Sequence, residues 1–248
     1  MSGDKKSASA PEPSASHASR GQASAERVDF DDYSASYDEL LHESTKLYAE
    51  DSEYFARYKV DLIRERTRGP VGRILEYGCG TGRNIGYLAQ AFPGAEIVGT
   101  DLSEESLRIA AGSHPQSRFE VERPDLDLGR FDLIFVASVF HHIPPDQRAG
   151  VMKVLARRLA PGGCLDIFEH NPFNPVTRRI VNTCPFDADA ILLKPAELRA
   201  LFRQAELALN KQSFCLFFPP RLSFLLPMEK YLEWLPLGGQ YWVRAQHP

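Results

Sequence analysis

The sequence predicts an α/β protein built on a doubly wound, parallel sheet. Three observations lead to this prediction. From about residue 71 onward, short apolar runs alternate with amphipathic segments of helical length. The first run ends in a glycine-rich turn, Gly78 to Gly82, and pairs of polar residues directly follow two later runs. Strand–helix alternation at this spacing is typical of parallel strands, because each helix carries the chain back across the sheet.

The elements can be placed in order along this part of the chain. Strands are predicted at 73–77, 96–101, 118–122, 131–138 and 164–169, with two later strands at about 210–218 and 240–246. One helix is predicted over 82–91, and a second follows Ser103, which is a good N-cap residue with acids in the next turn. Two more helices are predicted from Pro144 to about 159, stopped by the Pro-Gly-Gly at 161–163, and over 194–207.

The residues before the sheet divide into two parts. Thirteen of residues 1–26 are Ser or Ala, and this composition cannot bury enough apolar surface to offset the entropy of ordering. We therefore expect a disordered tail at 1–26. Residues 27–70 carry apolar side chains at three-to-four spacing and predict a helical cap on a catalytic domain of residues 71–248, with an aromatic insert at about 214–240.

Charge and cysteine content exclude several classes of protein. The net charge is −4, and residues 27–70, with 7 basic and 11 acidic residues, account for all of it. A dedicated nucleic-acid-binding protein is usually basic, so we expect no nucleic-acid partner. The four cysteines form no Cys-x-x-Cys pair, which argues against a disulfide framework or zinc site. No signal segment or membrane span is predicted, so we expect a cytoplasmic protein.

The glycine-rich turn has the form Glu76-x-Gly78-x-Gly80-x-Gly82. Glycines there permit positive φ and let the backbone approach a ligand at the start of a helix. A dinucleotide fingerprint would need a glycine where Arg83 stands, so that motif is absent. The alternative interpretation is a tight strand-to-helix turn without a ligand.

Asp101 closes the second predicted strand. A carboxylate at that strand end can accept hydrogen bonds from both hydroxyls of a ribose. The adjacent Leu102 is placed to pack on an adenine face. The alternative for Asp101 is an acid that only flanks the next helix, but its spacing from the glycine-rich turn favours the ribose role.

Four segments, ILEYGCGTG, GTDLSEESL, FDLIFVASVFHHI and LAPGGCLDI, together resemble the class I S-adenosylmethionine-dependent methyltransferases over residues 71–206. The resemblance implies a mostly parallel, seven-stranded, Rossmann-like sheet whose last strand is antiparallel, and S-adenosylmethionine as cofactor. It implies that Gly78, Gly80 and Gly82 hold the methionine part of the cofactor and that Glu76 orients this loop. It also implies a ribose contact at Asp101.

The same resemblance implies further cofactor contacts. Ser138 would lie beside the methionine part, and Asp125, or alternatively Asp127, would contact the adenine amino group. Tyr33 and Tyr37 resemble the aromatic residues of an N-terminal helix that closes over the cofactor. Their alternative role is packing between helices.

Two polar pairs follow the fourth and fifth predicted strands: His141 with His142, and Glu169 with His170. Ligands of open α/β sheets bind at these carboxyl ends, and a histidine oriented by a carboxylate can act as a base near neutral pH. All four residues are therefore candidate catalytic residues. In relatives, such a histidine pair either acts as the base or only shapes the pocket. The alternative for 169–174 is a rigid polar turn in which Asn171 and Asn174 cap the next helix. No metal site is predicted.

We expect methyl transfer from S-adenosylmethionine to a small molecule, with oxygen as the acceptor atom and nitrogen or carbon left open. Amino-directed enzymes often carry Asn/Asp-Pro-Pro-Tyr/Phe where this chain reads ASVF, which disfavours that class. The alternatives are RNA or protein methylation and a non-catalytic cofactor-binding protein. The aromatic insert has two interpretations. It forms the core beside an edge strand together with a hairpin loop, or it forms an apolar channel or a membrane-facing flap that would suit a hydrophobic or lipid-linked acceptor. Oligomeric state is not predicted.

Overall fold

The computed structural model describes residues 53–248. The predicted tail at 1–26, the first half of the predicted cap, and Tyr33 and Tyr37 lie outside the described residues. Within residues 53–248, no helix is both long enough and apolar enough to cross a lipid bilayer.

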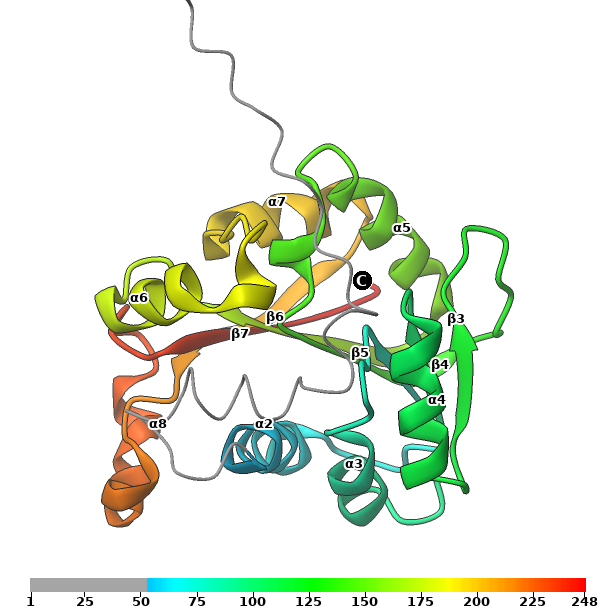
Figure 1. Ribbon diagram of the computed structural model, residues 1–248, viewed down its shortest axis with the longest axis horizontal. Coiled ribbons are helices and arrows are strands. Elements are labelled where there is room, and N and C mark those ends of the chain that lie inside the picture. The colour runs from blue at the N-terminus through cyan, green and yellow to red at the C-terminus, as the bar shows by residue number, and fades with distance from the viewer. Residues whose placement is uncertain (1–52) are drawn as a thin grey trace, which may run out of the picture.

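A seven-stranded sheet forms the centre of the molecule (Figure 1). Its strand order is β3-β2-β1-β4-β5-β7-β6, and β7 runs antiparallel to both of its neighbours. The predicted mostly parallel sheet with one antiparallel strand is therefore confirmed. The strands are β1 (Arg73–Tyr77), β2 (Glu96–Asp101), β3 (Arg118–Val121), β4 (Phe131–Ala137), β5 (Leu159–His170), β6 (Ala208–Cys215) and β7 (Gln240–Gln246).

Helices cover both faces of the sheet. Helices α2 and α3 lie on one face, and α5 and α7 lie on the other (Figure 1). The helices are α2 (Glu53–Arg66), α3 (Ile85–Ala91), α4 (Glu104–Ser113), α5 (Arg148–Arg158), α6 (Pro175–Thr183), α7 (Pro195–Gln204) and α8 (Glu229–Leu232). The part of the chain that the structure describes also holds the 3₁₀ segments η2 (Phe140–His142), η3 (Pro185–Asp187) and η4 (Pro220–Met228).

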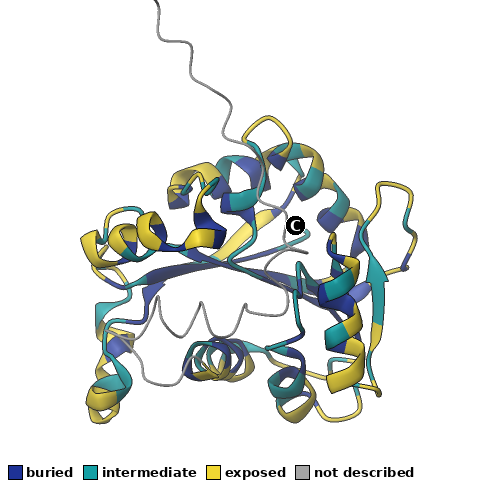
Figure 2. Ribbon diagram, viewed as in Figure 1, coloured by how far each residue is buried: buried dark blue, intermediate teal, exposed yellow. Residues whose placement is uncertain are grey.

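Strand β4 shows why a continuous apolar run forms a central strand. Residues 133–136 are fully buried, and successive side chains enter opposite core layers. Ile134 and Val136 pack under α5 and α7, whereas Leu133 and Phe135 pack against α2 and α3. Figure 2 shows the buried sheet between the partly exposed helices. A strand covered on both faces has no solvent side, so its sequence does not alternate.

Several predicted boundaries are wrong. The helix after the glycine-rich turn begins at Ile85 rather than Gly82, because the amide of Gly82 donates to the carbonyl of Cys79 and keeps the loop in a turn. The helix expected from Pro144 begins at Arg148, because Gln147 N donates to Pro144 O in a preceding turn. The fifth strand starts at Leu159, so the Pro-Gly-Gly segment lies inside β5.

A buried ion pair fixes α2 to the sheet. Arg244 of β7 donates to both carboxylate oxygens of Asp166 of β5, at 2.8 and 2.7 Å. The same guanidinium donates to the carbonyl of Arg66 at the end of α2, at 2.7 Å. Trp242 Nε1 donates to Asp166 at 2.8 Å. The carboxylate is thus fully satisfied, and helix and sheet share one polar anchor.

We predict that Arg244→Ala lowers the free energy of unfolding by about 3–5 kcal/mol, because it leaves the Asp166 carboxylate buried without its partner. Urea denaturation measures this value, with Arg157→Ala on the exposed side of α5 as the control. The double variant Arg244→Ala, Asp166→Ala should lose less free energy of unfolding than the two single variants lose when their losses are added. A loss below about 1 kcal/mol for Arg244→Ala, the size typical of surface pairs, contradicts the anchor.

Candidate active site

The glycine-rich loop connects β1 to α3 with three left-handed glycines. Gly78, Gly80 and Gly82 have φ values of +71°, +51° and +83°. A Cβ at Gly78 would lie 2.5 Å from a methyl group of Val139, and one at Gly82 would lie 3.0 Å from Ala110 Cβ. A Cβ at Gly80 would meet nothing within 4 Å. The outer glycines are therefore required by packing, whereas Gly80 faces open space.

Asp101 lies directly against this loop, as its spacing predicts. Its Oδ2 accepts from the amide of Gly80 at 2.8 Å, and its Oδ1 accepts from the amide of Ser103 at 3.0 Å. The amides of Gly78 and Cys79 both donate to the carbonyl of Thr100. The end of β2 thus fixes the loop and brings the Asp101 carboxylate to its edge.

Glu76 is buried beneath the loop. Its Oε1 accepts from Asn84 Nδ2 at 2.6 Å, but its Oε2 has no hydrogen-bond partner among the described residues. Burial raises the pKa of Glu76 to about 8, although Asn84 and Lys59 act in the opposite direction. The raised pKa means that the ligand-free group holds a proton at neutral pH. Its Oε2 is still a buried polar atom without a partner, so it marks a place where a charged ligand donor would replace that proton.

A cavity of about 340 Å³ extends from the glycine-rich loop to the predicted catalytic residues. Gly78 lines it at one end, His141, His142 and His170 line it at the other, and Ser138 lies between them. The structure thus brings five of the predicted site residues to one cavity. Polar lining residues that were not predicted are Lys59, Cys79, Thr81, Arg83, Asn84, Asn174, Thr177, Asp187 and Gln240.

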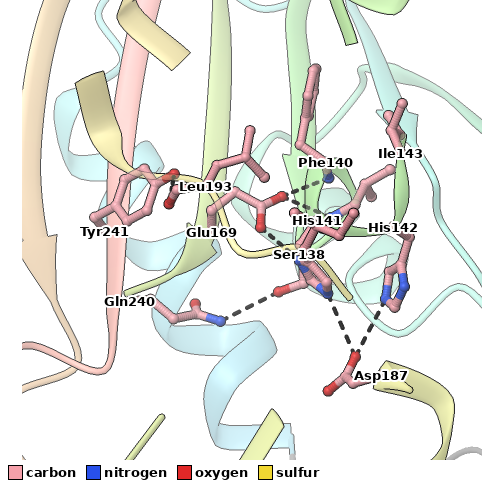
Figure 3. Close-up of polar contacts among 12 residues, drawn as sticks. Ser138, Phe140, His141, His142, Ile143, Glu169, Asp187, Leu193, Gln240 and Tyr241 are labelled. Carbon is pink, nitrogen blue, oxygen red and sulfur yellow. Dashed lines mark hydrogen bonds and ion pairs between the residues drawn. The ribbon is translucent and has the colours of Figure 1, made fainter. Parts of the chain in front are cut away.

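Glu169 does not line this cavity. Its Oε1 accepts from the amides of Val139 and Phe140, at 3.0 and 2.7 Å, and its Oε2 pairs with His141 Nδ1 at 2.7 Å (Figure 3). The side chain is fully buried. Glu169 is therefore a positioning residue, which fixes the ring of His141 and the turn that follows β4.

Ser138 shapes the same turn. Its φ is +59°, which is rare for any residue other than glycine, and its amide donates to the carbonyl of Phe168. Gln240 Nε2 donates to Ser138 Oγ at 3.3 Å, while Gln240 Oε1 and Thr81 Oγ1 have no partner among the described residues. These atoms leave further unmet polar groups in the cavity wall.

His142 lies between two aspartates that follow α6. Its Nδ1 is 3.1 Å from Asp189 Oδ1, and its Nε2 is 3.4 Å from Asp187 Oδ1. His141 Nε2 is 3.6 Å from the same Asp187 oxygen. Neither aspartate was predicted, because the segment around η3 has no motif and lies 45 residues after the histidines.

The carboxylates set the charge of this cluster. Burial lowers the pKa of His141, but Glu169 and Asp187 outweigh it and raise the pKa to about 9. Burial would raise the pKa of Asp187, but the two histidines hold it well below its usual range. Burial and the neighbouring His141 lower the pKa of His170 to about 4.

Glu76, Gly80, Gly82 and Asp101 form or support the glycine-rich loop but do not line the cavity. The predicted adenine contacts also lie outside it. Leu102 is 61% exposed, Asp125 is exposed on the loop after β3, and neither lines the cavity. The alternative Asp127 accepts from the amide of Gly129 in its own loop. The alternative of a capped turn after β5 is confirmed for Asn174, whose Oδ1 accepts from two amides at the start of α6. It is wrong for Asn171, whose Oδ1 accepts from the amide of Phe173 within the turn.

Comparisons with known proteins agree with this geometry. Residues 75–165 match the family model described as "Methyltransferase domain". The chain is 28% identical to trans-aconitate 2-methyltransferase of Variovorax paradoxus over 60% of this chain and 58% of that protein. It is 27% identical to the ubiquinone biosynthesis O-methyltransferase of Xanthomonas campestris over 66% of this chain and 74% of that protein.

A solved structure also resembles this fold. Magnesium protoporphyrin IX methyltransferase of Synechocystis, with bound S-adenosylmethionine, superposes with a TM-score of 0.58 at 15% identity and covers 89% of this chain and 98% of that chain. The chain spans about half the length of several curated relatives that it matches.

The sheet order and the glycine-rich loop beside an acidic strand end define a nucleoside-cofactor-binding α/β fold. The matched methyltransferase domain specifies the family further. The family model over residues 75–165 and the curated relatives support a class I S-adenosylmethionine-dependent methyltransferase, a family whose cofactor is S-adenosylmethionine.

We predict that Glu76→Gln flattens the pH dependence of stability. Because the folded-state pKa of Glu76 is raised, the wild-type fold holds this proton and loses stability as pH rises from about 4.5 to about 8. Each pH unit in this range costs at most about 1.4 kcal/mol. Urea denaturation at several pH values gives the difference between the two proteins, with the exposed Glu104→Gln as the control. Equal slopes for Glu76→Gln and the wild type contradict the prediction.

Proposed function

We propose that this chain transfers a methyl group from S-adenosylmethionine to an oxygen nucleophile of a small molecule. One observation carries the proposal: a single cavity has the glycine-rich loop at one end and the histidine cluster at the other. A sulfonium methyl group and its acceptor have to meet within one water-poor space, because the reaction depends on alignment.

The residues at the glycine end fit the cofactor. An α-ammonium group would donate to the unpartnered Oε2 of Glu76, and Thr81 Oγ1 and Lys59 would donate to the α-carboxylate. Gly80 leaves space for close approach. On this proposal the Asp101 carboxylate accepts from the ribose hydroxyls, as its spacing predicts. Contacts of Ser138 with the methionine part and of Leu102 and Asp125 with the adenine remain part of the proposal.

At the histidine end of the cavity, side chains position the acceptor and take up its proton. The acceptor oxygen forms a bond to the methyl carbon while the carbon–sulfur bond breaks, and the sulfur keeps the electron pair to give S-adenosylhomocysteine. The proton of the acceptor leaves toward Nε2 of His142, which Asp189 holds in place. His141, held by Glu169, lies beside it and carries a proton of its own below its pKa of about 9. His170 completes this wall. General-base assistance of this kind contributes about 10²–10⁴-fold to a rate.

The relatives support a small-molecule acceptor. The printed names of two of them are trans-aconitate 2-methyltransferase and ubiquinone biosynthesis O-methyltransferase. RNA or protein methylation is supported by no described surface, and the net charge of −4 argues against nucleic acid. The cytoplasmic location remains part of the proposal.

Apolar side chains at one side of the cavity favour a hydrophobic acceptor. Val176 and Leu237 line the cavity and are 55% and 63% exposed. Trp234 and Phe224, from the aromatic insert, are also largely exposed. Exposed apolar side chains on a cavity wall are typical of contact with an apolar ligand, and those on the insert are typical of contact with a lipid surface.

We predict that Asp101→Ala weakens cofactor binding, whereas substitution of His141 or His142 lowers turnover. Loss of a charged hydrogen-bond acceptor costs about 1.5–3 kcal/mol, so Asp101→Ala should raise the Kd for S-adenosylmethionine at least about tenfold in calorimetry. His141→Gln and His142→Ala should leave this Kd unchanged. They should lower kcat by about 10²-fold or more, measured with labelled cofactor and a metabolite extract.

The matched control is Asp61→Ala, an exposed position on α2 that does not line the cavity. No heat with S-adenosylmethionine and no competition by S-adenosylhomocysteine in the wild type rule out the proposed function. Unchanged turnover in both histidine variants removes the histidine pair from the mechanism.

We also predict that the aromatic insert contacts lipid. Full-length protein should float with anionic liposomes, and the double variant Phe224→Ser, Trp234→Ser should lose most of this binding because its wetted apolar area is smaller. Phe173→Ser, an exposed aromatic residue outside the insert, is the control. Recovery of the wild type entirely in the aqueous fraction excludes the membrane-facing flap.

A further inference from the structure

Two histidines and one aspartate in the cavity wall converge on one point. The Nε2 atoms of His141 and His142 are 3.6 and 3.4 Å from the same oxygen of Asp187. Figure 3 shows both contacts meeting at this carboxylate. The ligand-capable atoms of the three residues all lie within 4.8 Å of one another.

These separations suit a shared ion better than hydrogen bonds. They exceed the usual 2.7–3.2 Å range of N–H···O hydrogen bonds. Two ligands that each lie about 2.0–2.1 Å from one tetrahedral ion are about 3.4 Å apart. His141 and Asp187 are both almost completely buried, so the arrangement is built into the protein and is not a surface encounter.

The opposite ring nitrogens provide a second, independent observation. His141 Nδ1 is 2.7 Å from the Glu169 carboxylate, and His142 Nδ1 is 3.1 Å from the Asp189 carboxylate. A histidine that binds a metal almost always donates its other N–H to such a partner, which fixes the tautomer and turns the free lone pair toward the ion. Both histidines have this support, and both present Nε2 to Asp187.

The two ligand-bearing segments are held together without an ion. The amide of Ile191 donates to the carbonyl of His141 at 2.8 Å. The buried Arg148 donates to the carbonyls of Ile143 and Ile191, at 2.8 and 2.7 Å. These bonds fix the loop after η3 against η2, so the ligands are positioned in advance.

We propose that His141 Nε2, His142 Nε2 and the Asp187 carboxylate bind a divalent transition-metal ion of the Zn²⁺ type. Two imidazoles and one carboxylate suit this class of ion, and three protein ligands with an open position are typical of catalytic sites. All three residues line the cavity, so the open position faces it. A bound ion takes the Nε2 lone pairs, so the histidines serve as base only in the metal-free protein. That an acceptor oxygen takes the open position rests on the proposed function; the metal site itself does not.

The test uses the full chain after removal of metal with a chelator. Calorimetric titration with Zn²⁺ should show one ion per chain, and Co²⁺ should give the visible absorption of a four-coordinate ion. Asp187→Asn and His142→Ala should lose this binding. Asp189→Asn keeps all three ligands and should weaken binding about 10–100-fold. Asp146→Asn and His247→Ala, which lie outside the cluster, are the matched controls and should bind as the wild type does.

Three results overturn the metal site. The first is binding of less than one Zn²⁺ per wild-type chain. The second is a Co²⁺ spectrum that remains that of the six-coordinate aqueous ion. The third is a Zn²⁺ affinity that is unchanged in Asp187→Asn, which would mean an adventitious ion only. The wild-type Co²⁺ spectrum decides the question even if a variant does not fold. Heat with S-adenosylmethionine but none with Zn²⁺ contradicts the metal site alone. The reverse result contradicts the proposed function alone.

Discussion

The buried carboxylate of Glu169 is the contact on which the candidate site depends. It accepts two backbone amides from the turn after β4 and the Nδ1 proton of His141. Without it, two amides would be buried unpaired beside a turn that already holds Ser138 at positive φ. One side chain at the end of β5 therefore sets the path of the neighbouring chain and the direction of the histidine ring.

The order of the strands explains why distant residues meet. Strands β1, β4 and β5 are parallel neighbours, so the glycine-rich loop, the histidine turn and Glu169 all lie at one edge of the sheet. Strand β7 runs the other way, so its first residue, Gln240, pairs with His170 at that same edge. The antiparallel strand thus contributes its start to the cavity, where the parallel strands contribute their ends.

Helix α2 and the aromatic insert close the other side of this cavity. Glu229 of α8 accepts from the amides of Phe217 and Phe218 and from the hydroxyl of Tyr58 on α2. Glu233 pairs with Lys211 of β6, at 2.6 Å, and with Arg66 of α2. The insert is therefore bound to the fold by acids on its inner side, while Phe224, Tyr231 and Trp234 remain exposed.

Local features were predictable from the sequence. Strands 73–77, 96–101 and 240–246, the Ser103 cap, and Gly78 to Gly82 beside Asp101 depend on neighbouring residues or on one fixed spacing. The tertiary structure alone decided that Asp187 and Asp189 meet the two histidines, that Arg244 reaches Asp166, and that Glu169 supports the site without entering it. The physical reason is that such side chains converge through packing of segments far apart in the chain, and no local pattern of residues encodes that convergence.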